Sequence, residues 1–575
     1  MTCIGSLLRR AGRATTAVAL MAGAGLVISA TIAGSAAAQS TSEARKDGWF
    51  AQLWPGAASS GGVSEIKKTS DGTPAPATDD SRSDARAEGL RGNLWPSPSY
   101  VGASPKKKTA GDGAEPAAGK SGSTHSKEDL FRPDPLYEAK YDPKAQVDIY
   151  GAKVEVDPPR PLLELGRPQY TSGMYDESST LLGALNPLLP GLSIYGDWRT
   201  AVAYNRNNGK DIPQIATRLN LDVDFKITAT ERIHAFFTPL QRGATQFTRY
   251  EFNRADGNGR FNDEIDLNPQ TLFFEGDLGS IYAGLSGRPS AFDLPFTVGL
   301  FPLFLQNGIW ANDAILGGAF SIPAKNSAAL GLPNFDVTFF AAFDDVNNVG
   351  ILGPDKRNAH IYGVTTFIDA FSGYIEAGYG LIQGVDGAVN GQQTHFLTAA
   401  YSRRFAHALS NSTRVFANFG NGDNDDGVAI ISENSFITRL PSTLIPYANF
   451  FVGFGNPHPL VDGNGAGILK NVGINFETDA LTGYPKLDDT ASNAYGGAIG
   501  LQYLFNLDQQ LLFEVATVQP FENDGFGTRR AQYAFGARYQ IPITRAWLLR
   551  ADATYQLIEG EEDNFGVRME MRRKF

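Results

Sequence analysis

Charged residues recur at every second position in segments whose remaining positions are apolar. In residues 218–227 the polar positions alternate with Leu, Val, Phe and Ile, and they are Arg218, Asn220, Asp222, Asp224 and Lys226. This pattern predicts a β-strand with one polar and one apolar face, because successive side chains of a strand point to opposite sides. A row of guanidinium, ammonium and carboxylate groups can contact hydrophilic solutes, whereas the opposite face requires an apolar environment.

Basic residues outnumber acidic ones on the polar faces of the strands that can be phased in this way. The excess of Arg indicates a mild preference for anions, although charges on the wall of a wide barrel usually pair with one another into ladders. Both interpretations stay open. The residues assigned to this polar lining are Arg199, Arg218, Asp222, Asp224, Lys226, Arg404, Arg414, Arg538, Arg550, Asp552, Arg568, Glu570 and Arg572.

Other residue types that could do chemistry lack the required spacing. His234, His360 and His395 fall on predicted strands without a Ser two positions on, so lipase chemistry has no support. Residues 256–258 and 422–426 resemble fragments of calcium loops, but neither has the downstream bidentate Glu, so we interpret both as solvated loop tips. We therefore predict no enzyme activity, no cofactor and no bound metal. A protease built on Asp and His is not excluded by motif alone.

The polar rows require antiparallel strands to position them, and the chain supplies the turns. Short turns are expected at 228–230, 276–279, 371–373, 506–508 and 542–544. They alternate with longer polar stretches at 205–213, 241–268, 288–311, 344–357, 383–393, 421–426, 455–493 and 521–528. Tight turns at one rim and long loops at the other are typical of transmembrane barrels.

The predicted fold class is all-β, a transmembrane antiparallel β-barrel over residues 192–575. Counting segments gives about 18 strands, or about 16 if two segments are wrongly split. A soluble sandwich also alternates. It is disfavoured because charges such as Asp222, Arg538 and Arg550 recur in the middle of strands, and because the apolar rows are rich in aromatic residues.

The C-terminus has the pattern of a strand that closes such a barrel. Its apolar positions are Phe565, Val567, Met569, Met571 and Phe575, whereas Gly566, Arg568, Glu570, Arg572 and Lys574 alternate with them. Arg573 interrupts the apolar row. A terminal Phe resembles the recognition signal that outer-membrane barrels present to the barrel assembly machinery, so Phe575 is the predicted assembly signal.

The N-terminus has the features of a secretory signal peptide over residues 1–38. Three Arg precede an apolar stretch, and Ala36 to Ala38 offer a small-residue cleavage site. The one cysteine, Cys3, lies inside this segment, so the mature chain has no thiol chemistry. The chain has 61 acidic and 50 basic residues, which argues against nucleic acid as a partner. Localisation to the outer membrane of a Gram-negative-type bacterium follows.

Two further segments precede the predicted barrel. Residues 39–130 are dominated by Ser, Gly, Ala, Pro, Lys and Asp, from which no core can be built, so we predict a disordered periplasmic arm. Residues 131–191 are rich in Pro and Leu and could form a small plug under the barrel.

The run Gly196-Asp-Trp-Arg-Thr200, followed by residues 217–228, resembles the opening hairpin of alginate-export-type and related substrate-specific porins. That resemblance covers a few dozen residues in detail and the architecture of residues 192–575. It implies a barrel of 16 or 18 strands that passes small solutes or anionic polysaccharide. The segment before residue 190 departs from the family pattern, so the substrate of the family is not carried over to this chain.

In many porins the third long loop folds inward and narrows the pore. The third long loop here is 288–311, and its middle is too apolar to lie in water. We nominate it as the constriction, against the alternatives of an outer lid or an extra lipid-facing segment. The nominated residues are Phe292, Asp293, Phe296, Phe301 and Phe304.

The sequence therefore predicts an outer-membrane channel, a porin, for passive passage of small hydrophilic solutes, with anions preferred. Its predicted partners are outer-membrane lipid, the barrel assembly machinery and those solutes. One alternative is a structural anchor whose N-terminal arm binds the cell wall, and a weaker one is an outer-membrane hydrolase. Monomer or homotrimer, the solute and the direction of transport stay open.

Overall fold

The computed structural model describes residues 161–166, 179–243, 246–252, 259–344, 346–348, 359–421, 426–440, 443–463, 467–477, 481–505, 509–521, 530–544 and 546–575. The predicted signal peptide, the arm, the 506–508 turn and the first calcium-loop fragment lie outside these residues, as do residues 422–425 of the second. Among the described residues, no helix is both long and apolar enough to cross a membrane.

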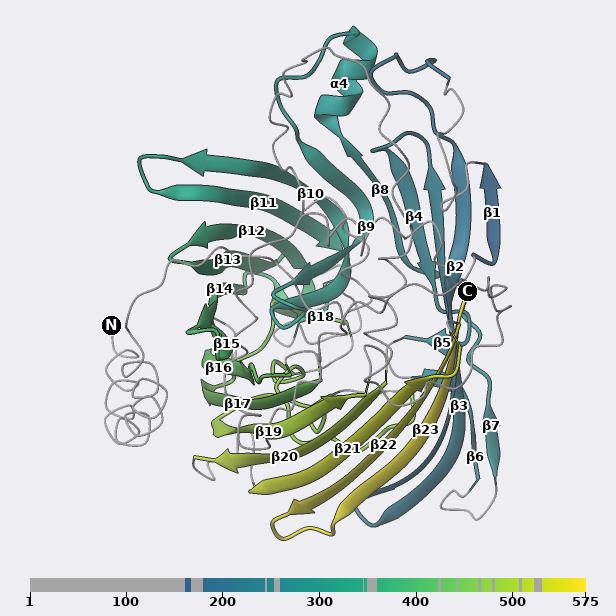
Figure 1. Ribbon diagram of the computed structural model, residues 1–575, viewed down its shortest axis with the longest axis vertical. Helices are drawn as coiled ribbons and strands as arrows, with labels where there is room; N and C mark the ends of the chain where they lie inside the picture. The colour runs from purple at the N-terminus through teal and green to yellow at the C-terminus, as the bar shows by residue number, and fades with distance from the viewer. Residues whose placement is uncertain are drawn as a thin grey trace, which may run out of the picture.

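Eighteen antiparallel strands of the described chain form a closed barrel, which confirms the predicted fold class and the larger strand count (Figure 1). Each strand pairs with the next one along the chain. The wall strands are β2 (Gly191–Asn207), β3 (Lys210–Lys226), β4 (Arg232–Phe237), β8 (Pro269–Asp277), β9 (Pro295–Leu305), β10 (Ala311–Ser327), β11 (Leu332–Asp344), β12 (Ala359–Ala370), β13 (Gly373–Gly384), β14 (Gln393–Phe405), β15 (Leu409–Gly420), β16 (Gly427–Phe436), β17 (Leu444–Gly455), β19 (Ala494–Leu504), β20 (Gln510–Pro520), β21 (Gln532–Pro542), β22 (Trp547–Ile558) and β23 (Asn564–Lys574).

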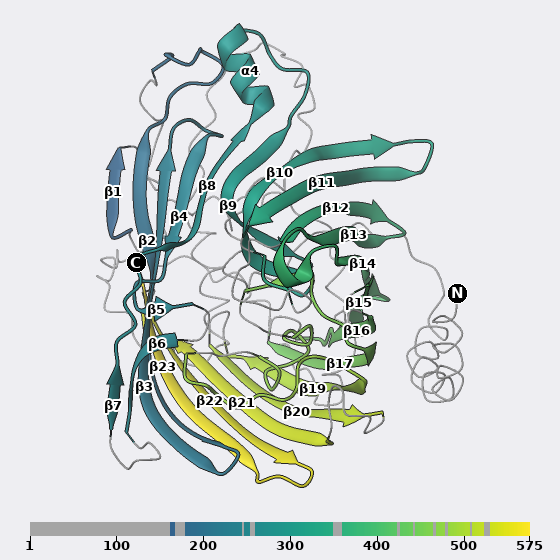
Figure 2. The ribbon, with the colours of Figure 1, turned by 180° about the vertical axis from the view of Figure 1, so that it is seen from behind.

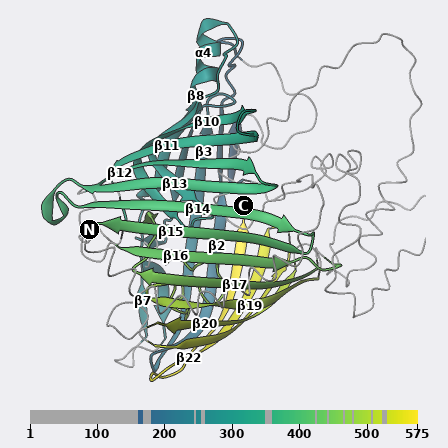
Figure 3. The same cartoon turned by 90° about the vertical axis from the view of Figure 1, so that its left-hand side faces the viewer.

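The first and last wall strands close the barrel. β23 pairs with β2 from Asp197 opposite Lys574 to Arg206 opposite Phe565. Beyond the last ladder pair, the backbone N–H of Phe575 donates to the carbonyl of Gly196 at 3.1 Å and that of Gly196 donates back at 2.9 Å. We call the rim where β2 begins and β23 ends the terminal rim, and the opposite one the distal rim. In Figure 3 strands β11 to β20 run across the view in front of β2, β3 and β8.

The alternation of side chains agrees with the facing predicted from the sequence. On β21 the side chains of Tyr533 and Phe535 are 47% and 52% exposed, whereas Ala534 between them is fully buried. On β23 the exposed apolar residues are Val567 and Met569. The polar neighbours of these residues point inward, where the barrel interior buries them. The outer surface is therefore apolar and the inner surface mixed.

Three of the predicted connections differ from the observed ones, and the third, residues 288–311, contains the wall strand β9. Residues 205–213 were expected to form a loop, but β2 and β3 stay paired to Asn207 opposite Lys210, and Asn208 and Gly209 make a tight turn with positive φ. The turn expected at 276–279 instead leads into the helix α4 (Leu278–Ser286), which Asp277 caps through its carboxylate at 2.6 Å from the N–H of Ser280. A capping Asp followed by a helix-compatible run is the signal that the turn prediction overlooked.

Additional short strands lie at both rims. β1 (Leu163–Gly166) adds to the edge of β2 at the terminal rim, and β5 (Gln241–Arg242), β6 (Gln246–Glu251) and β7 (Arg260–Asn262) lie in the β4–β8 connection. The turn η5 (Gly387–Val389) joins β13 to β14. The residues 179–190 pack on α4, and the side-chain amide of Asn186 donates to Glu231 at 2.7 Å. A plug role for residues 131–191 stays a prediction.

The connection from β17 to β19, residues 456–493, folds into the barrel, and we call it the inner loop. Its β18 (Val461–Asp462) runs parallel to the start of β10. The side chains of Leu460, Ile468, Leu469 and Phe476 are fully buried and share one hydrophobic core with inward residues of β8 to β21. The barrel interior is therefore partly filled by its own chain.

Candidate functional site

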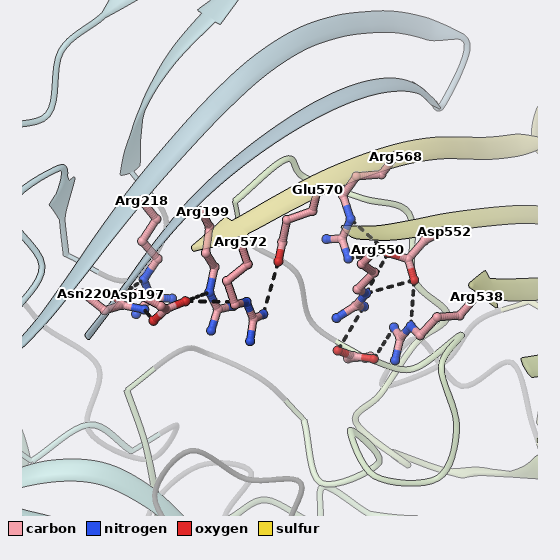
Figure 4. A network of polar contacts seen from close by, with 11 residues as sticks. Asp197, Arg199, Arg218, Asn220, Arg538, Arg550, Asp552, Arg568, Glu570 and Arg572 are labelled. Atoms are coloured by element: carbon pink, nitrogen blue, oxygen red, sulfur yellow. Dashed lines mark hydrogen bonds and ion pairs between the residues drawn. The ribbon is translucent and has the colours of Figure 1, made fainter. Parts of the chain in front are cut away.

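Six guanidinium groups lie on the inner face of five adjacent strands, and we call them the arginine row. They come from β21, β22, β23, β2 and β3, which are neighbours because the barrel closes between β23 and β2. Figure 4 shows these side chains together with the carboxylates between them. The members are Arg538, Arg550, Arg568, Arg572, Arg199 and Arg218, all of which the sequence assigned to the polar lining.

Asp197 organises one end of the row. Its carboxylate is fully buried and accepts from Arg199 Nε at 2.7 Å and from the amide of Asn220 at 2.7 Å. Arg572 Nε lies 3.5 Å from the same carboxylate. Because a buried charge is stable only with partners, this carboxylate fixes the position of the guanidinium groups around it.

Arg218 differs from the other members of the row. Its Nε donates to Asn220 Oδ1 at 2.8 Å, and its guanidinium lies 5.8 Å from the ring centre of Phe247. Among the described residues, no carboxylate lies within ion-pair distance of it. Its positive charge is therefore balanced less completely than that of its neighbours.

Asp552 and the inner-loop residue Glu477 organise the other end. Asp552 accepts from Arg538 at 2.7 Å, from Arg550 at 2.8 Å and from Arg568 at 2.6 Å. Glu477 approaches from the opposite side and contacts Arg538, and Arg550 at 3.3 Å. The wall and the inner loop are thus joined by charge-assisted hydrogen bonds.

The acidity of Glu477 reflects this position. Burial alone would raise the pKa of its carboxyl group, but the guanidinium groups of Arg538, Arg550 and Arg568 together hold that pKa well below its ordinary value. The side chain is 37% exposed, so solvent reaches the contact between the loop and the wall.

A second contact holds the inner loop through its backbone. Glu514 on β20 accepts from the N–H groups of Ile474 and Asn475, each at 2.9 Å. Asn475 also accepts from the hydroxyl of Thr554 on β22 at 2.8 Å. A further contact joins the loop to β2 and β3, where Asn205 and Gln214 both donate to the carbonyl of Thr482.

Two wall glycines make room for the loop at the arginine row. A Cβ on Gly536 would lie 2.8 Å from the amide of Asn475, and a Cβ on Gly566 would lie 2.6 Å from Pro485. The ring of Tyr484, next to that proline, lies 5.4 Å from the Arg568 guanidinium. The small wall residues therefore let the loop approach closely.

Two acidic residues of the predicted lining, Asp222 and Asp224, lie towards the terminal rim. Asp222 and Asp224 are inward on β3, and both are buried. Asp224 lies 3.7 Å from Arg232 and 3.9 Å from His234. Among the described residues, one oxygen of each of these carboxylates has no hydrogen-bond partner. Lys226 is exposed at the end of the same strand.

Not every residue of the predicted lining joins the arginine row. Arg414 is inward on β15, where it pairs with Glu433, and Arg404 is exposed near the terminal end of β14. Glu570 lies within the arginine row, where its carboxylate is 3.1 Å from Arg572. Among the described residues, no cluster of three or more His, Cys, Asp or Glu could hold a metal ion.

The predicted constriction was wrong, because residues 295–305 form the wall strand β9. It pairs with β8 and β10 along its length, and Phe296, Phe301 and Phe304 are part of this strand. Phe292 and Asp293 lie in the return from α4 at the terminal rim. The apolar run arises because β9 has the outer surface on one face and the core on the other, so Phe301 is buried while Val298 is 55% exposed.

The inner loop holds the site residues that the sequence analysis did not assign. Glu477, Asn475 and Tyr484 contact the wall, but none lies on a strand with a readable period. One signal was available, because the 455–493 stretch is the longest of the predicted loops. Its apolar residues include Ile468, Leu469 and Val472. A long loop with such residues needs a core to cover.

No family model matches the chain, and no curated protein matches it. Among solved structures it is similar to OccK7 (OpdD) of Pseudomonas aeruginosa, with 8% identity, a TM-score of 0.45, and 67% of this chain and 98% of that chain covered. It is also similar to OccAB4 of Acinetobacter baumannii, with 10% identity, a TM-score of 0.43, and coverages of 67% and 98%. A third is OccK2 (OpdF) of Pseudomonas aeruginosa in complex with glucuronate, with 9% identity, a TM-score of 0.44, and coverages of 67% and 98%. Because identity and TM-score are low, the function of this chain must be argued from its own geometry.

Proposed function

We propose that this protein is an outer-membrane channel for small hydrophilic solutes, that anions pass preferentially along the arginine row, and that the inner loop is the constriction. The observation that carries the proposal is the arginine row itself, a continuous band of guanidinium groups on the inner face of a closed barrel with an apolar exterior.

The exterior supports the membrane part of the proposal. Large apolar side chains are exposed all around the wall, for example Phe343, Phe513 and Phe535 at 52–53%. Their number would be costly in water, but a lipid environment requires such a surface. Every wall strand is paired on both sides, so no backbone edge would be left unpaired in the bilayer.

Charge balance supports the preference for anions. Five of the six guanidinium groups of the row contact four carboxylates, those of Asp197, Asp552, Glu570 and Glu477. The excess is positive, and Arg218 lacks a carboxylate among the described residues. A fixed positive excess on the wall of a narrow passage raises the local concentration of anions.

Steric filling supports the constriction. The inner loop packs against β8 to β21 through a hydrophobic core, so the passage is confined to the side that faces the arginine row. Glu477 and Tyr484 are the loop residues on this side, where they contact Arg538 and Arg568. A solute that enters would pass along the arginine row beside this contact.

Reversal potentials in planar bilayers across a KCl gradient test the proposal. Arg218→Gln should shift the selectivity of the purified protein towards cations, because the least balanced positive charge of the row is lost. The matched control is Arg573→Gln, which removes the same charge from the outer face of β23. Equal shifts in both variants would contradict the assigned lining. A correctly folded protein without ion current would exclude the channel and leave the structural anchor, and turnover of lipid or peptide in detergent would indicate the hydrolase.

The same proposal includes recognition of Phe575 by the barrel assembly machinery. Deletion of Phe575 removes the reciprocal backbone hydrogen bonds with Gly196 as well as the aromatic side chain. Phe575→Ala keeps the backbone and removes the ring alone, so it separates the two effects. We expect both variants to reach lower levels in the outer membrane than the parent. A normal level of Phe575→Ala would show that the ring is not a signal.

A further inference from the structure

An apolar stripe on α4 is exposed at the surface of the described chain. Leu278, Tyr282 and Leu285 are spaced four and three residues apart, so they lie on one face of the helix, and they are 43%, 51% and 75% exposed. Phe292, in the return to β9, is 46% exposed, and its ring centre lies 6.3 Å from that of Tyr282. The helix has no charged residue. We call Leu278, Tyr282 and Leu285 the α4 stripe.

The opposite face of α4 is locked in place, so the stripe cannot turn inward. Gly279, Ala283 and Gly284 are buried there. A Cβ on Gly284 would lie 2.5 Å from the carbonyl oxygen of Leu182, so the helix and the 179–190 segment touch backbone to backbone. The two caps fix the ends, with Asp277 at the N-terminus and Gly287 in the left-handed conformation at the C-terminus.

The stripe continues the apolar outer surface of the wall. Leu272 and Phe274 are outward on β8, and Leu278, the first residue of α4, follows an even number of positions later. The ring of Phe274 lies 5.8 Å from that of Phe296 on β9, next to the exposed Val298. Figure 2 shows α4 at the ends of β8 and β9. An unbroken apolar track therefore leads from the lipid-facing wall onto the helix.

Aromatic residues at the terminal rim indicate the depth at which the helix lies. Trp198, Trp547, Tyr503, Phe436 and Phe371 are outward and 39–77% exposed near this rim. Aromatic girdles of this kind mark the boundary between hydrocarbon and head groups. At β8 and β9 the helix stands at the corresponding position, and Tyr282 and Phe292 provide the aromatic rings there.

We propose that α4 is an interfacial helix whose stripe inserts into the head-group boundary of the periplasmic leaflet of the outer membrane. The proposal rests on the proposed membrane location of the barrel. A lipid surface is the occupant that the observations favour, because the stripe is continuous with the lipid-facing wall and the helix carries no charge that a protein partner could pair. The other connections at this rim are short, such as residues 371–372 and 406–408, and short turns are typical of the periplasmic rim of a transmembrane barrel.

Spin labels on single cysteines test the proposal in the full chain. Cys3 is the one native cysteine, so a Cys3→Ser background lets each position be labelled alone. The test position is Leu285→Cys, the matched helix control is Ser286→Cys, and the wall control is Leu272→Cys. The purified protein is reconstituted in phosphatidylethanolamine and phosphatidylglycerol vesicles. Collision rates with oxygen, which concentrates in lipid, and with a water-soluble nickel chelate are then compared.

We expect the labels at Leu285 and Leu272 to collide more with oxygen than with the nickel chelate, and the label at Ser286 to show the reverse order. A Leu285 label that behaves like Ser286, while Leu272 reports lipid, would overturn the interfacial helix and leave the channel intact. Spin–spin broadening at Leu285 would show that a second copy covers the stripe and would also overturn it. A water-exposed Leu272 label would instead defeat the membrane location, and with it both proposals.

Discussion

The two sides of the barrel interior have the same strand geometry but carry different types of inward side chains. From β8 to β20 large apolar residues such as Phe396, Phe416 and Ile431 face inward, and the inner loop packs on them as in a soluble core, with Arg414 and Glu514 as charged exceptions. From β21 through the closure to β3 the large inward residues are mostly Arg, Asp and Asn, and most of them pair with one another (Figure 4). One side is a core and the other is a lining.

This difference shows why the interior of such a barrel cannot be judged from average hydropathy. On both sides of the interior, every second residue of a wall strand faces inward. The environment of such a residue depends on whether the inner loop covers it. A covered position favours Phe, Ile or Ala, whereas an uncovered one needs a charged or hydrogen-bonded group.

Removing the inner loop should raise the single-channel conductance several-fold, because the loop fills the core side of the interior and its removal widens the narrowest section. The variant replaces residues 467–491 by a short Gly-Ser linker. The control shortens the β13–β14 connection at residues 387–391, which lies at the distal rim. An unchanged conductance in a correctly folded loop variant would place the constriction elsewhere.

Truncating a core residue should destabilise the core side strongly. Phe396 is 1% exposed, and its ring meets that of His458 edge to face at 5.2 Å. Phe396→Ala should lower the free energy of unfolding by about 3–5 kcal/mol, since the cavity is enclosed by the loop and the wall. Its neighbour Leu397 is outward and 44% exposed, so Leu397→Ala is the control. Denaturant unfolding in vesicles measures both, and equal losses would argue against a packed core.

A charge on the outer surface should be costly on either side of the barrel. Phe535 is outward on β21, at the junction of the two sides. Phe535→Arg should cost about 2–4 kcal/mol if the residue lies near the bilayer midplane. Phe535→Leu keeps an apolar side chain and should cost less. If unfolding measurements find the two variants equally stable, this surface does not face lipid.

Much of the lining could be predicted from the sequence, because strand period is a local property. Arg218 and Asp222 on β3, and Arg550 and Asp552 on β22, could be phased from their neighbours alone, and the structure places them inward. The strand count followed from turns and loops in the same way. Some of their partners lie far away in the sequence, such as Arg568 for Asp552 and Glu477 for Arg550, so the predicted lining could not be divided into paired and unpaired charges.

The position of the proposed constriction could not be predicted, because two apolar segments, residues 295–305 and the inner loop, were both suited to narrow the pore. Residues 295–305 are apolar because one face of β9 belongs to the apolar outer surface and the other packs in the core, and a strand with two apolar faces loses its alternation. The inner loop carries Leu469 and Phe476 in a stretch without period. Choosing between them requires the pairing partners of β9, which lie at long range in β8 and β10.

Acid should loosen the contact between the loop and the arginine row only at low pH. The folded-state pKa of Glu477 is lowered from the ordinary value of 4.5. Its contribution to stability is therefore fully present above pH 4.5 and is lost as the pH falls through the lower folded pKa. Open-channel noise should stay constant from neutral pH down to this value and rise in stronger acid. Glu477→Gln should be noisier at every pH, and identical traces for both proteins would remove Glu477 from the anchor.

The smallest expected effect concerns the outer face of the charged side, where Arg573 interrupts the apolar row of β23. Its guanidinium lies 5.7 Å from the ring centre of Trp547, and the two residues are partners in the β22–β23 ladder. Near the rim a long side chain can place its charge in the head groups while its stem covers apolar surface, so this Arg is compatible with the lipid-facing row.

Arg573→Ala should lower the free energy of unfolding by about 0.5–1 kcal/mol, since Trp547 is 40% exposed and an exposed cation–π contact is weak. Arg573→Lys should retain part of this contact. If Arg573→Ala destabilises as much as Phe396→Ala, the guanidinium has a structural role that the outer face of this barrel does not explain.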